Sequence, residues 1–314
     1  MIGRQLVSLL VELGANVRVV SLDDHPEMNK NVEFKKLNLL SYDNCLTACK
    51  GMDYVFHLVG IKGSPLAVRK QPASFFVPVL LFNTNMMEAA RVSKVKRYLF
   101  TSTLGVYAPA KKFYEDDVWK TFPSPNDRYG AWAKRMGELQ AETYAIEYGW
   151  KEIAIVRPAN VYGPYDNFDP INSMVIPSLI RRVVEGENPL KVWGDGSEVR
   201  DFIHARDVAV GMLLAMEKRA DGTPINLGSG KGVRIKDLVT AICGCVATPP
   251  KIEWDLSKKS GDKIRIMDIS RAQKIGFNPQ VTLLEGIRET MEWYVQHKKS
   301  LAKRYNVFHQ KTFI

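Results

Sequence analysis

The chain has 314 residues, of which 46% are hydrophobic and 25% are charged, and its net charge at pH 7 is +10. This is the ordinary composition of a globular protein, long enough for a large core or for one large and one small domain. No apolar run reaches the length that spans a bilayer, so we expect a soluble, cytoplasmic protein that does not enter a membrane.

The positive charge is spread along the sequence, apart from a local excess in the segment KKSLAKRYNVFHQK. There is no zinc-finger pattern and no aromatic–basic RNA signature, so we interpret this charge as solvated surface and expect no nucleic-acid partner. The cysteines lack the spacing of a zinc site and are predicted to be reduced structural thiols, with no bound metal. They are Cys45, Cys49, Cys243 and Cys245.

The first half of the chain alternates helices and strands. Leu6, Leu9, Leu10 and Leu13 fall on one face at helical spacing, and Gly14 ends this first helix. The pattern then predicts strands at 15–22 and 32–39, a helix at 42–51, a strand at 52–60, a helix at 72–94, a strand at 95–103, a helix at 128–149 and a strand at 151–163. The alternation indicates an α/β fold with a doubly wound parallel sheet, and the apolar run at 15–22 predicts a strand buried on both faces.

Beyond about residue 160 the pattern loosens, after a polar, turn-rich stretch. It predicts helices at 174–186, 205–218, 234–244 and 283–299, strands at 189–194 and 223–230, and a loop at 194–201. These pieces suit a smaller C-terminal lobe, over residues 161–314, that is interleaved with the end of the sheet.

The opening residues look like the second half of a dinucleotide-binding turn, in which glycines let the backbone approach a pyrophosphate at a helix N-terminus. Gly3 stands where the last of these glycines belongs. Asp23 and Asp24 end the next strand, where a carboxylate binds the ribose 2′-hydroxyl and repels the 2′-phosphate of NADP. Gly60 ends the strand after that and allows close packing of a cofactor. We therefore expect residues 1–160 to be a domain that binds NAD.

The first strand and the two preceding glycines of such a turn are absent from the sequence. We expect them in about ten residues upstream of Met1 in the functional protein, so that the domain is Rossmann-type with its first strand truncated.

Two further segments carry chemistry. Ser102 and Thr103 follow a predicted strand, where either hydroxyl could bond a substrate oxygen or equally cap a turn. Tyr129 and Lys134 share the first turns of a long helix. A nearby ammonium lowers the pKa of a tyrosine and makes its phenol a usable general base.

These motifs occur in the order found in a known family. The chain resembles the extended short-chain dehydrogenases/reductases of the NAD-dependent nucleotide-sugar epimerase/dehydratase family, and within it the GDP-fucose synthases and sugar 4-epimerases. The similarity rests on MIGRQL, DYVFHLVG, YLFTSTLGVY, RPANVYGP, VWGDGSEVRDFIHARDVA, INLGSG and DISRAQKIGFNP.

The resemblance implies roles for residues of three kinds. The catalytic residues would be Thr103, Tyr129 and Lys134. The cofactor-binding residues would be Gly3, Asp23, Asp24, Asn38, Leu39, Gly60, Tyr129 and Lys134. The substrate-binding residues would be Ser102, Asn160, Arg200 and Arg265, with the two arginines on the diphosphate. Relatives pair through two long helices, here near 72–92 and 128–147, so we expect a homodimer.

The chain also departs from the family. The family spaces its catalytic pair as Tyr-x-x-x-Lys, whereas Tyr129 and Lys134 are five residues apart and Gly130 stands four before the lysine. GDP-fucose synthases use a cysteine where this chain has Gly105 and a histidine where it has Met174. The dehydratases carry carboxylates after the catalytic threonine, where this chain has Leu104–Gly105.

With these groups absent, the simplest reaction that the residues can support is one at C4 of the sugar. We predict an NAD-dependent epimerase that inverts C4 of a nucleoside-diphosphate sugar through a transient 4-keto intermediate. One alternative is a 4-keto-sugar reductase that consumes NAD(P)H. The other is a catalytically silent nucleotide-binding protein on the same scaffold, which the five-residue Tyr–Lys spacing favours.

Overall fold

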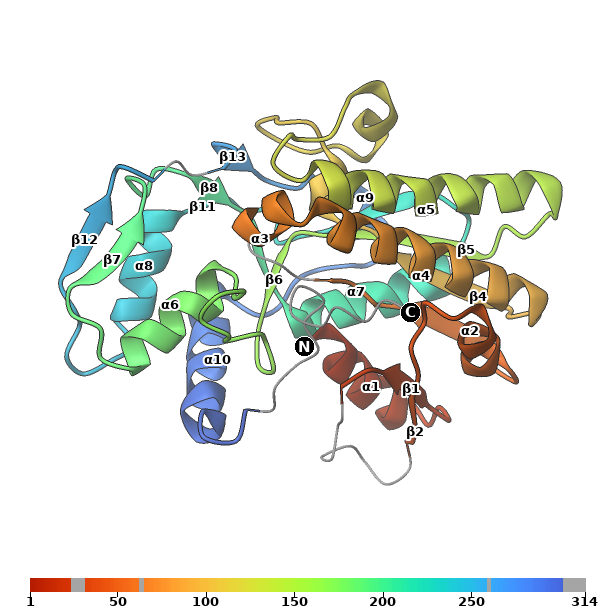
Figure 1. The fold of residues 1–314 in the computed structure, drawn as a ribbon, viewed down its shortest axis with the longest axis horizontal. Coiled ribbons are helices and arrows are strands. Elements are labelled where there is room, and N and C mark those ends of the chain that lie inside the picture. Colours follow the sequence, from red (N-terminus) through yellow and green to blue (C-terminus); the bar gives the residue numbers. More distant parts are fainter. Residues whose placement is uncertain (24–31, 62–64, 259–260, 302–314) are drawn as a thin grey trace.

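A four-stranded parallel sheet lies at the centre of the computed structural model, which describes residues 1–23, 32–61, 65–258 and 261–301 (Figure 1). Its strand order is β10-β5-β4-β3, and every pairing in it is parallel. The strands are β3 (Tyr54–His57), β4 (Arg97–Thr101), β5 (Ile153–Pro158) and β10 (Pro224–Leu227). The predicted α/β fold with a parallel sheet is therefore confirmed.

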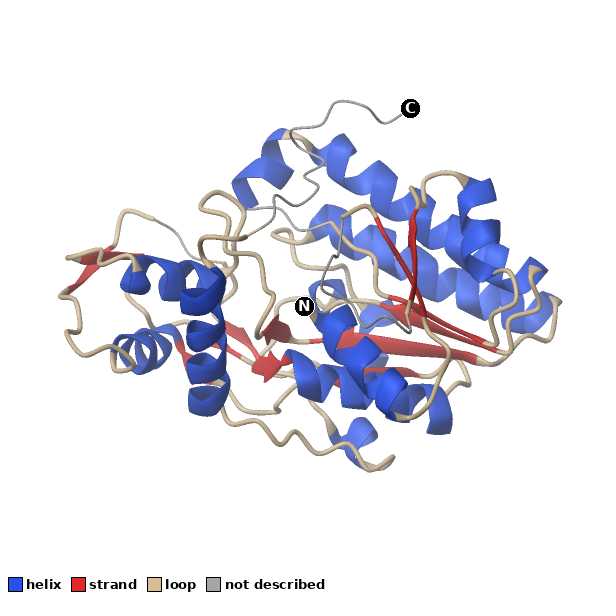
Figure 2. Cartoon of the chain, turned by 90° about the horizontal axis from the view of Figure 1, so that it is seen from below, coloured by secondary structure: helices blue, strands red, loops and turns tan. Residues whose placement is uncertain are grey.

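Helices cover both faces of this sheet, as Figure 2 shows from below. One face carries α2 (Tyr42–Cys49), α4 (Pro72–Val92) and α5 (Arg128–Glu147), and the other carries α1 (Ile2–Glu12) and α7 (Ala205–Lys218). Side chains alternate along β4 accordingly, because Tyr98 and Phe100 pack under α4 and α5 while Leu99 packs under α7. The predicted helices at the start of the chain, at 72–94 and at 128–149 agree with these bounds to within two residues.

A second, two-stranded parallel sheet lies beside the first. It pairs β1 (Arg18–Ser21) with β2 (Glu33–Lys36), and within the described residues β1 is not hydrogen-bonded to β3. The prediction that the 15–22 strand is buried on both faces is wrong, since all four residues of β1 are partly exposed. A strand needs covered neighbours on both sides to be fully buried, and β1 is an end strand.

The predicted strand at 151–163 is two strands. β5 belongs to the main sheet, whereas β6 (Asn160–Tyr162) pairs with β9 (Phe202–His204) in the C-terminal lobe. The change of partner falls at Ala159, whose N–H donates to Leu227, while the next N–H, of Asn160, donates to Asp201. This crossing point joins the sheet to the lobe.

The lobe is built from short strands and three helices. β7 (Leu190–Trp193) pairs with β12 (Ile252–Asp255), and β8 (Val199–Arg200) lies between β11 (Val233–Arg234) and β13 (Ile264–Arg265). The helices are α6 (Val175–Val184), α8 (Ile235–Cys243) and α10 (Leu283–His297). The predicted loop at 194–201 therefore contains a strand, which is only two residues long and has both partners distant in sequence.

The remaining elements connect these layers. They are α3 (Pro65–Lys70), α9 (Ser270–Gln273), and the 3-10 turns η1 (Leu104–Val106) and η2 (Glu115–Lys120). The cysteines are all free thiols. Within the described ranges no helix combines the length and apolar character needed to cross a membrane.

Candidate active site

The polar residues expected from the sequence gather where the parallel strands end. Thr103 follows β4, Asn160 follows β5, and Gly60 lies three residues beyond β3. Asp23 follows β1 of the neighbouring small sheet. Carboxyl ends of parallel strands share one edge, which is where open α/β sheets place their ligands.

The glycines at this edge leave room for a dinucleotide. No described atom lies within 4 Å of the place that a Cβ at Gly60 would take, and at Gly3 only Leu58 does, at 3.8 Å. Gly3 is in the first turn of α1, so the end of that helix and the end of β3 meet here. These surroundings fit the close backbone approach that a pyrophosphate needs.

The residues expected to surround the adenosine have different environments in the structure. Asp23 is half-buried and its N–H donates to the hydroxyl of Ser21, while Asp24 lies outside the described residues. The side chain of Asn38 accepts the N–H of Leu40 and so holds its own turn. The side chain of Leu39 is 8% exposed and packs in the core, and its backbone oxygen accepts a hydrogen bond from the thiol of Cys45.

Lys134 is held in a buried polar group on the inner face of α5. Its Nζ donates to Oδ1 of Asn83 at 3.3 Å and lies 5.0 Å from the centre of the Phe100 ring. The same oxygen of Asn83 accepts a hydrogen bond from Nε2 of His57 at 2.9 Å. Burial lowers the pKa of Lys134 to about 7, against the opposing charge of Glu138. Near neutral pH the lysine therefore exists in both protonation states.

Tyr129 and Lys134 are not brought together. Tyr129 is the second residue of α5 and is 38% exposed, and its hydroxyl has no hydrogen-bond partner among the described residues. Lys134 lies about 140° further round the helix. The residue one turn before Lys134 is Gly130, where an added Cβ would come within 3.0 Å of Cε1 of Phe75. The ring of Phe75, from α4, therefore occupies the space that a side chain at position 130 would need.

Thr103 and Ser102 have different surroundings. Thr103 is half-buried, and its Oγ1 accepts the N–H of Gly105 at 3.2 Å, which caps η1. Ser102 is only 4% exposed, and its Oγ donates to Glu138 at 2.5 Å. Glu138 in turn forms a fully buried ion pair with Arg157. The hydroxyl of Ser102 therefore supports this ion pair, and its role in substrate binding stays a prediction.

Arg200 and Arg265 are register partners on the parallel strands β8 and β13, so their side chains share one face. Nη2 of Arg265 lies 2.6 Å from Oδ2 of Asp127 and also pairs with Asp262. Burial works to lower the pKa of Arg265, but the two carboxylates outweigh it and raise that pKa. Burial, followed by the charge of Arg265, lowers the pKa of Arg200. The four side chains form a compact cluster in which two cations face two carboxylates.

Asp201 holds this arginine pair in place. Its carboxylate accepts the N–H groups of Ser229, Gly230 and Met267 and the hydroxyl of Ser229, which ties together the ends of β10 and β13. Asn160 donates its side-chain N–H to the backbone oxygen of Asp201 at 2.8 Å. Asn160 is thus beside β8, the strand that carries Arg200.

A cavity of about 570 Å³ lies on the other face of β8. It is lined by Asp195, Ser197, Val199, Arg234, Lys236, Lys263 and Ile264. Since Val199 lines it and successive side chains of a strand point to opposite faces, this cavity is separate from the face that carries Arg200.

Three residues that organise the site gave little signal in the sequence. Asn83 follows the apolar stretch of α4, where a buried amide is the only hint of a polar partner. Asp127 reads as a helix cap, and Asp201 as the neighbour of a candidate arginine. Their roles depend on segments far away in the chain, so spacing alone does not reveal them.

Comparison with known proteins identifies relatives along most of the chain. Residues 1–228 match the model of the NAD dependent epimerase/dehydratase family. The chain is 35% identical over 240 residues to probable GDP-L-fucose synthase 1 of Oryza sativa subsp. japonica, covering 74% of this chain and 73% of that protein. It is 27% identical over 311 residues to a dTDP-4-dehydro-6-deoxy-D-allose reductase of Streptomyces sp, covering 95% and 94%.

Among solved structures, the fold is similar to that of the UDP-glucose 4-epimerase of Thermotoga maritima with UDP-glucose. The TM-score is 0.84 at 28% identity, over 95% of this chain and 96% of the epimerase.

Proposed function

Because the chain belongs to the NAD dependent epimerase/dehydratase family of enzymes, we propose that it inverts C4 of a nucleoside-diphosphate sugar through a transient 4-keto intermediate. The coarser statement, that this is a nucleotide-sugar epimerase or reductase, has the support of relatives of both kinds. We choose C4 epimerisation because of the residues that follow β4. Thr103 supplies a hydroxyl there, but Leu104 and Gly105 supply no group that can transfer a proton.

Tyr129, Thr103 and Lys134 have separate roles in the proposed reaction at C4. In this proposal the phenol of Tyr129 takes the proton of the 4-hydroxyl, and Thr103 donates a hydrogen bond to the same oxygen. Lys134 supplies positive charge that favours the phenolate and holds the nicotinamide ribose. NAD, when bound, would supply a reversible hydride acceptor beside C4. Tyr129 must turn inward to do this, since it starts from an exposed position.

The arginine pair is the proposed diphosphate site. Arg200 and Arg265 place two guanidinium groups on one face of β8 and β13, with Asn160 beside them. Planar guanidinium groups suit phosphate oxygens, because each can donate two parallel hydrogen bonds. The base and the sugar remain open in this proposal.

NAD is the proposed cofactor, with NADP as the alternative. Asp23 follows β1, where its negative charge disfavours a 2′-phosphate. Residues 1–160 would bind the cofactor, and residues 161–314 would mainly bind the substrate.

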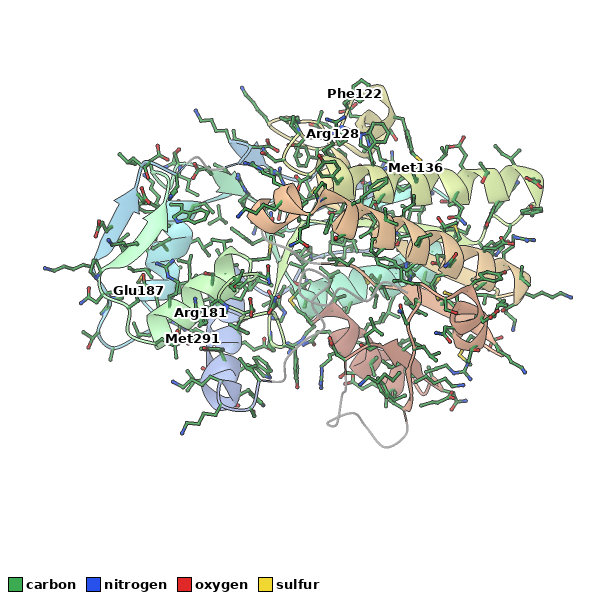
Figure 3. All side chains as sticks on the ribbon, viewed as in Figure 1. Phe122, Arg128, Met136, Arg181, Glu187 and Met291 are labelled. Carbon is green, nitrogen blue, oxygen red and sulfur yellow. The ribbon has the colours of Figure 1, made fainter. Side chains whose placement is uncertain are left out.

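A homodimer is proposed through α4 and α5, which pack side by side. Their outer surface exposes apolar side chains, with Val77 at 46%, Leu81 at 43% and Leu139 at 39%. Met136, which is labelled in Figure 3, is a further apolar residue of α5 and is partly exposed. Exposed apolar side chains that gather on one face are typical of surfaces that bind another protein.

Two other functions have specific support. A reductase is favoured by the similarity to the Streptomyces reductase over nearly the whole chain. A catalytically silent nucleotide-binding protein is favoured by the contact of Phe75 with Gly130, which fills the place one turn before Lys134.

The decisive experiment begins with the purified protein, denatured to release any bound nucleotide. An epimerase retains NAD and converts UDP- or GDP-sugars without added cofactor, whereas a reductase consumes NAD(P)H. The Tyr129→Phe variant should lose at least about a hundredfold in turnover, because general-base catalysis contributes about that much. Turnover that survives in Tyr129→Phe contradicts the catalytic assignment, and nucleotide binding with no turnover supports the silent alternative.

A further inference from the structure

The segment just before α5 is tied to the substrate arginines by several polar contacts. Asp262, three residues before Arg265, accepts hydrogen bonds from Ser124 Oγ at 3.1 Å and from Asn126 Nδ2 at 2.9 Å. It also accepts from Nε of Arg265 at 3.0 Å. Asp127 completes the connection through its ion pair with Arg265. These contacts therefore join β13, which carries Arg265, to the start of α5, which carries Tyr129.

The two carboxylates of this cluster are held very differently. Asp262 makes contacts with three neighbouring side chains and is only 9% exposed. The side chain of Asp127 is 36% exposed and contacts Arg265 alone among the charged groups of the described residues. An incoming anion that takes hydrogen bonds from Arg265 would therefore displace Asp127 and leave Asp262 where it is.

Asp127 has a second position available to it. It is the N-cap residue of α5, yet its side chain makes no capping hydrogen bond there. An aspartate at this place ordinarily accepts the N–H of the second or third helical residue, which here are Tyr129 and Gly130. A negative charge is also favourable at a helix N-terminus. The pairing with Arg265 keeps Asp127 from this capping role.

We propose that Asp127 is a positioning residue that links diphosphate binding to the first turn of α5. A diphosphate takes over Arg265 and repels the carboxylate of Asp127, which then caps the N–H of Tyr129 or Gly130. The turn that carries Tyr129, which already has the backbone hydrogen bond from Ala131 to Asp127, then gains a side-chain cap when the diphosphate is in place. This inference rests on the proposed function, because it uses the arginine pair as the diphosphate site.

Amide hydrogen exchange of residues 128–132 tests the link without any ligand. The Arg265→Met variant removes the cation, so Asp127 should cap the helix, and exchange in this turn should slow at least threefold relative to the wild type. The double variant Asp127→Ala/Arg265→Met should lose that slowing. A matched control is the Asp116–Arg271 ion pair, which lies outside this cluster. Arg271→Met should leave exchange at 128–132 unchanged.

The second arm uses GDP, UDP and dTDP as probes, which are the nucleotides named in the relatives. Saturating nucleotide should slow exchange at 128–132 in the wild type and not in Asp127→Ala. Asp127→Ala should also bind the nucleotide about threefold more tightly or better, because no carboxylate competes for Arg265. Thermal unfolding of each variant checks that the fold is intact.

The outcomes separate the two proposals. Unchanged exchange in Arg265→Met overturns the link, whether or not nucleotides bind. Nucleotide that binds the wild type without slowing exchange also overturns it. If none of GDP, UDP and dTDP binds, the proposed function fails, while the comparison of Arg265→Met with the double variant still decides whether Asp127 can change partners.

Discussion

Phe75 of α4 and Gly130 of α5 pack directly against each other, with 3.0 Å between Cε1 of the ring and the place of a Cβ at position 130. A side chain at 130 must therefore displace the ring. We expect Gly130→Tyr to destabilise the protein by about 1–3 kcal/mol, the usual cost of overpacking. Urea unfolding measures this, and a Gly130→Tyr variant as stable as the wild type would show that the ring gives way freely.

The double variant Phe75→Ala/Gly130→Tyr makes room for the new phenol. It places a tyrosine four residues before Lys134, on the same helical face. We expect the double variant to recover part of the lost stability and to show higher turnover of nucleotide sugars than the wild type. Turnover equal to that of Phe75→Ala alone would contradict the importance of this spacing.

Lys134 should make the protein more stable as the pH rises above neutrality. Its pKa is about 7 in the folded protein and 10.5 ordinarily, so between these values the unfolded chain binds more protons. The free energy of unfolding therefore increases with pH across this window. We expect Lys134→Met to abolish the increase, with its largest stability advantage at pH 7 and below.

Unfolding in urea at pH 6, 7 and 9 checks this prediction, with the exposed Lys151→Met as control. Burial raises the pKa of Cys45 and Cys49 to about 12, so these thiols lower stability as the pH rises above about 9. Their effect is the same in wild type and variant and cancels in the comparison. Parallel pH curves for wild type and Lys134→Met would contradict the lowered pKa.

Glu138 and Ser102 should affect stability and not substrate affinity. Glu138→Ala leaves Arg157 buried without its partner, which costs about 3–5 kcal/mol. Ser102→Ala removes one hydrogen bond to the carboxylate, worth about 1.5–3 kcal/mol. Chemical unfolding and KM measurements separate the effects. A Ser102→Ala variant with normal stability and a tenfold higher KM would show that Ser102 is a substrate ligand.

The apolar outer face of α4 and α5 should control association. A charge at Leu81, which is 43% exposed, would be buried in the proposed dimer but solvated in a monomer. We expect Leu81→Lys to dissociate the dimer with little change in monomer stability. Sedimentation velocity measures this, and the exposed Ile146 at the far end of α5 provides an apolar control position. A wild type that is already monomeric would contradict the proposal.

The sequence was sufficient for the long elements and for the edge of the sheet that carries the site. Helices such as α4 and α5 are specified by local spacing of apolar residues, and the strand ends follow from the alternation. The sequence was not sufficient where the interacting residues are far apart in the chain. The pairing of β8 with β13 joins residues about sixty positions apart, and the ion pair of Arg265 with Asp127 joins residues more than a hundred apart.

The same limit explains the expectation for Ser102. A hydroxyl at the end of a strand suits a ligand or a turn equally well, and its hydrogen bond to Glu138 of the buried Glu138–Arg157 pair has no local signal in the sequence. Lys134 was identified from its neighbour Tyr129, yet its actual partner is Asn83 on another helix. Residues that act through tertiary contacts carry no local pattern.

The strand β10 has a consequence for how the chain reaches this structure. β10 pairs with β5 at the edge of the central sheet. In the chain, however, it comes after segment 159–223, which forms about half of the lobe and α7. During synthesis, β5 therefore waits with an open edge while about sixty residues emerge, and such edges are prone to pair with other chains. The central sheet and the lobe must therefore fold together. A nascent chain halted near residue 220 should depend on chaperones far more than the complete chain.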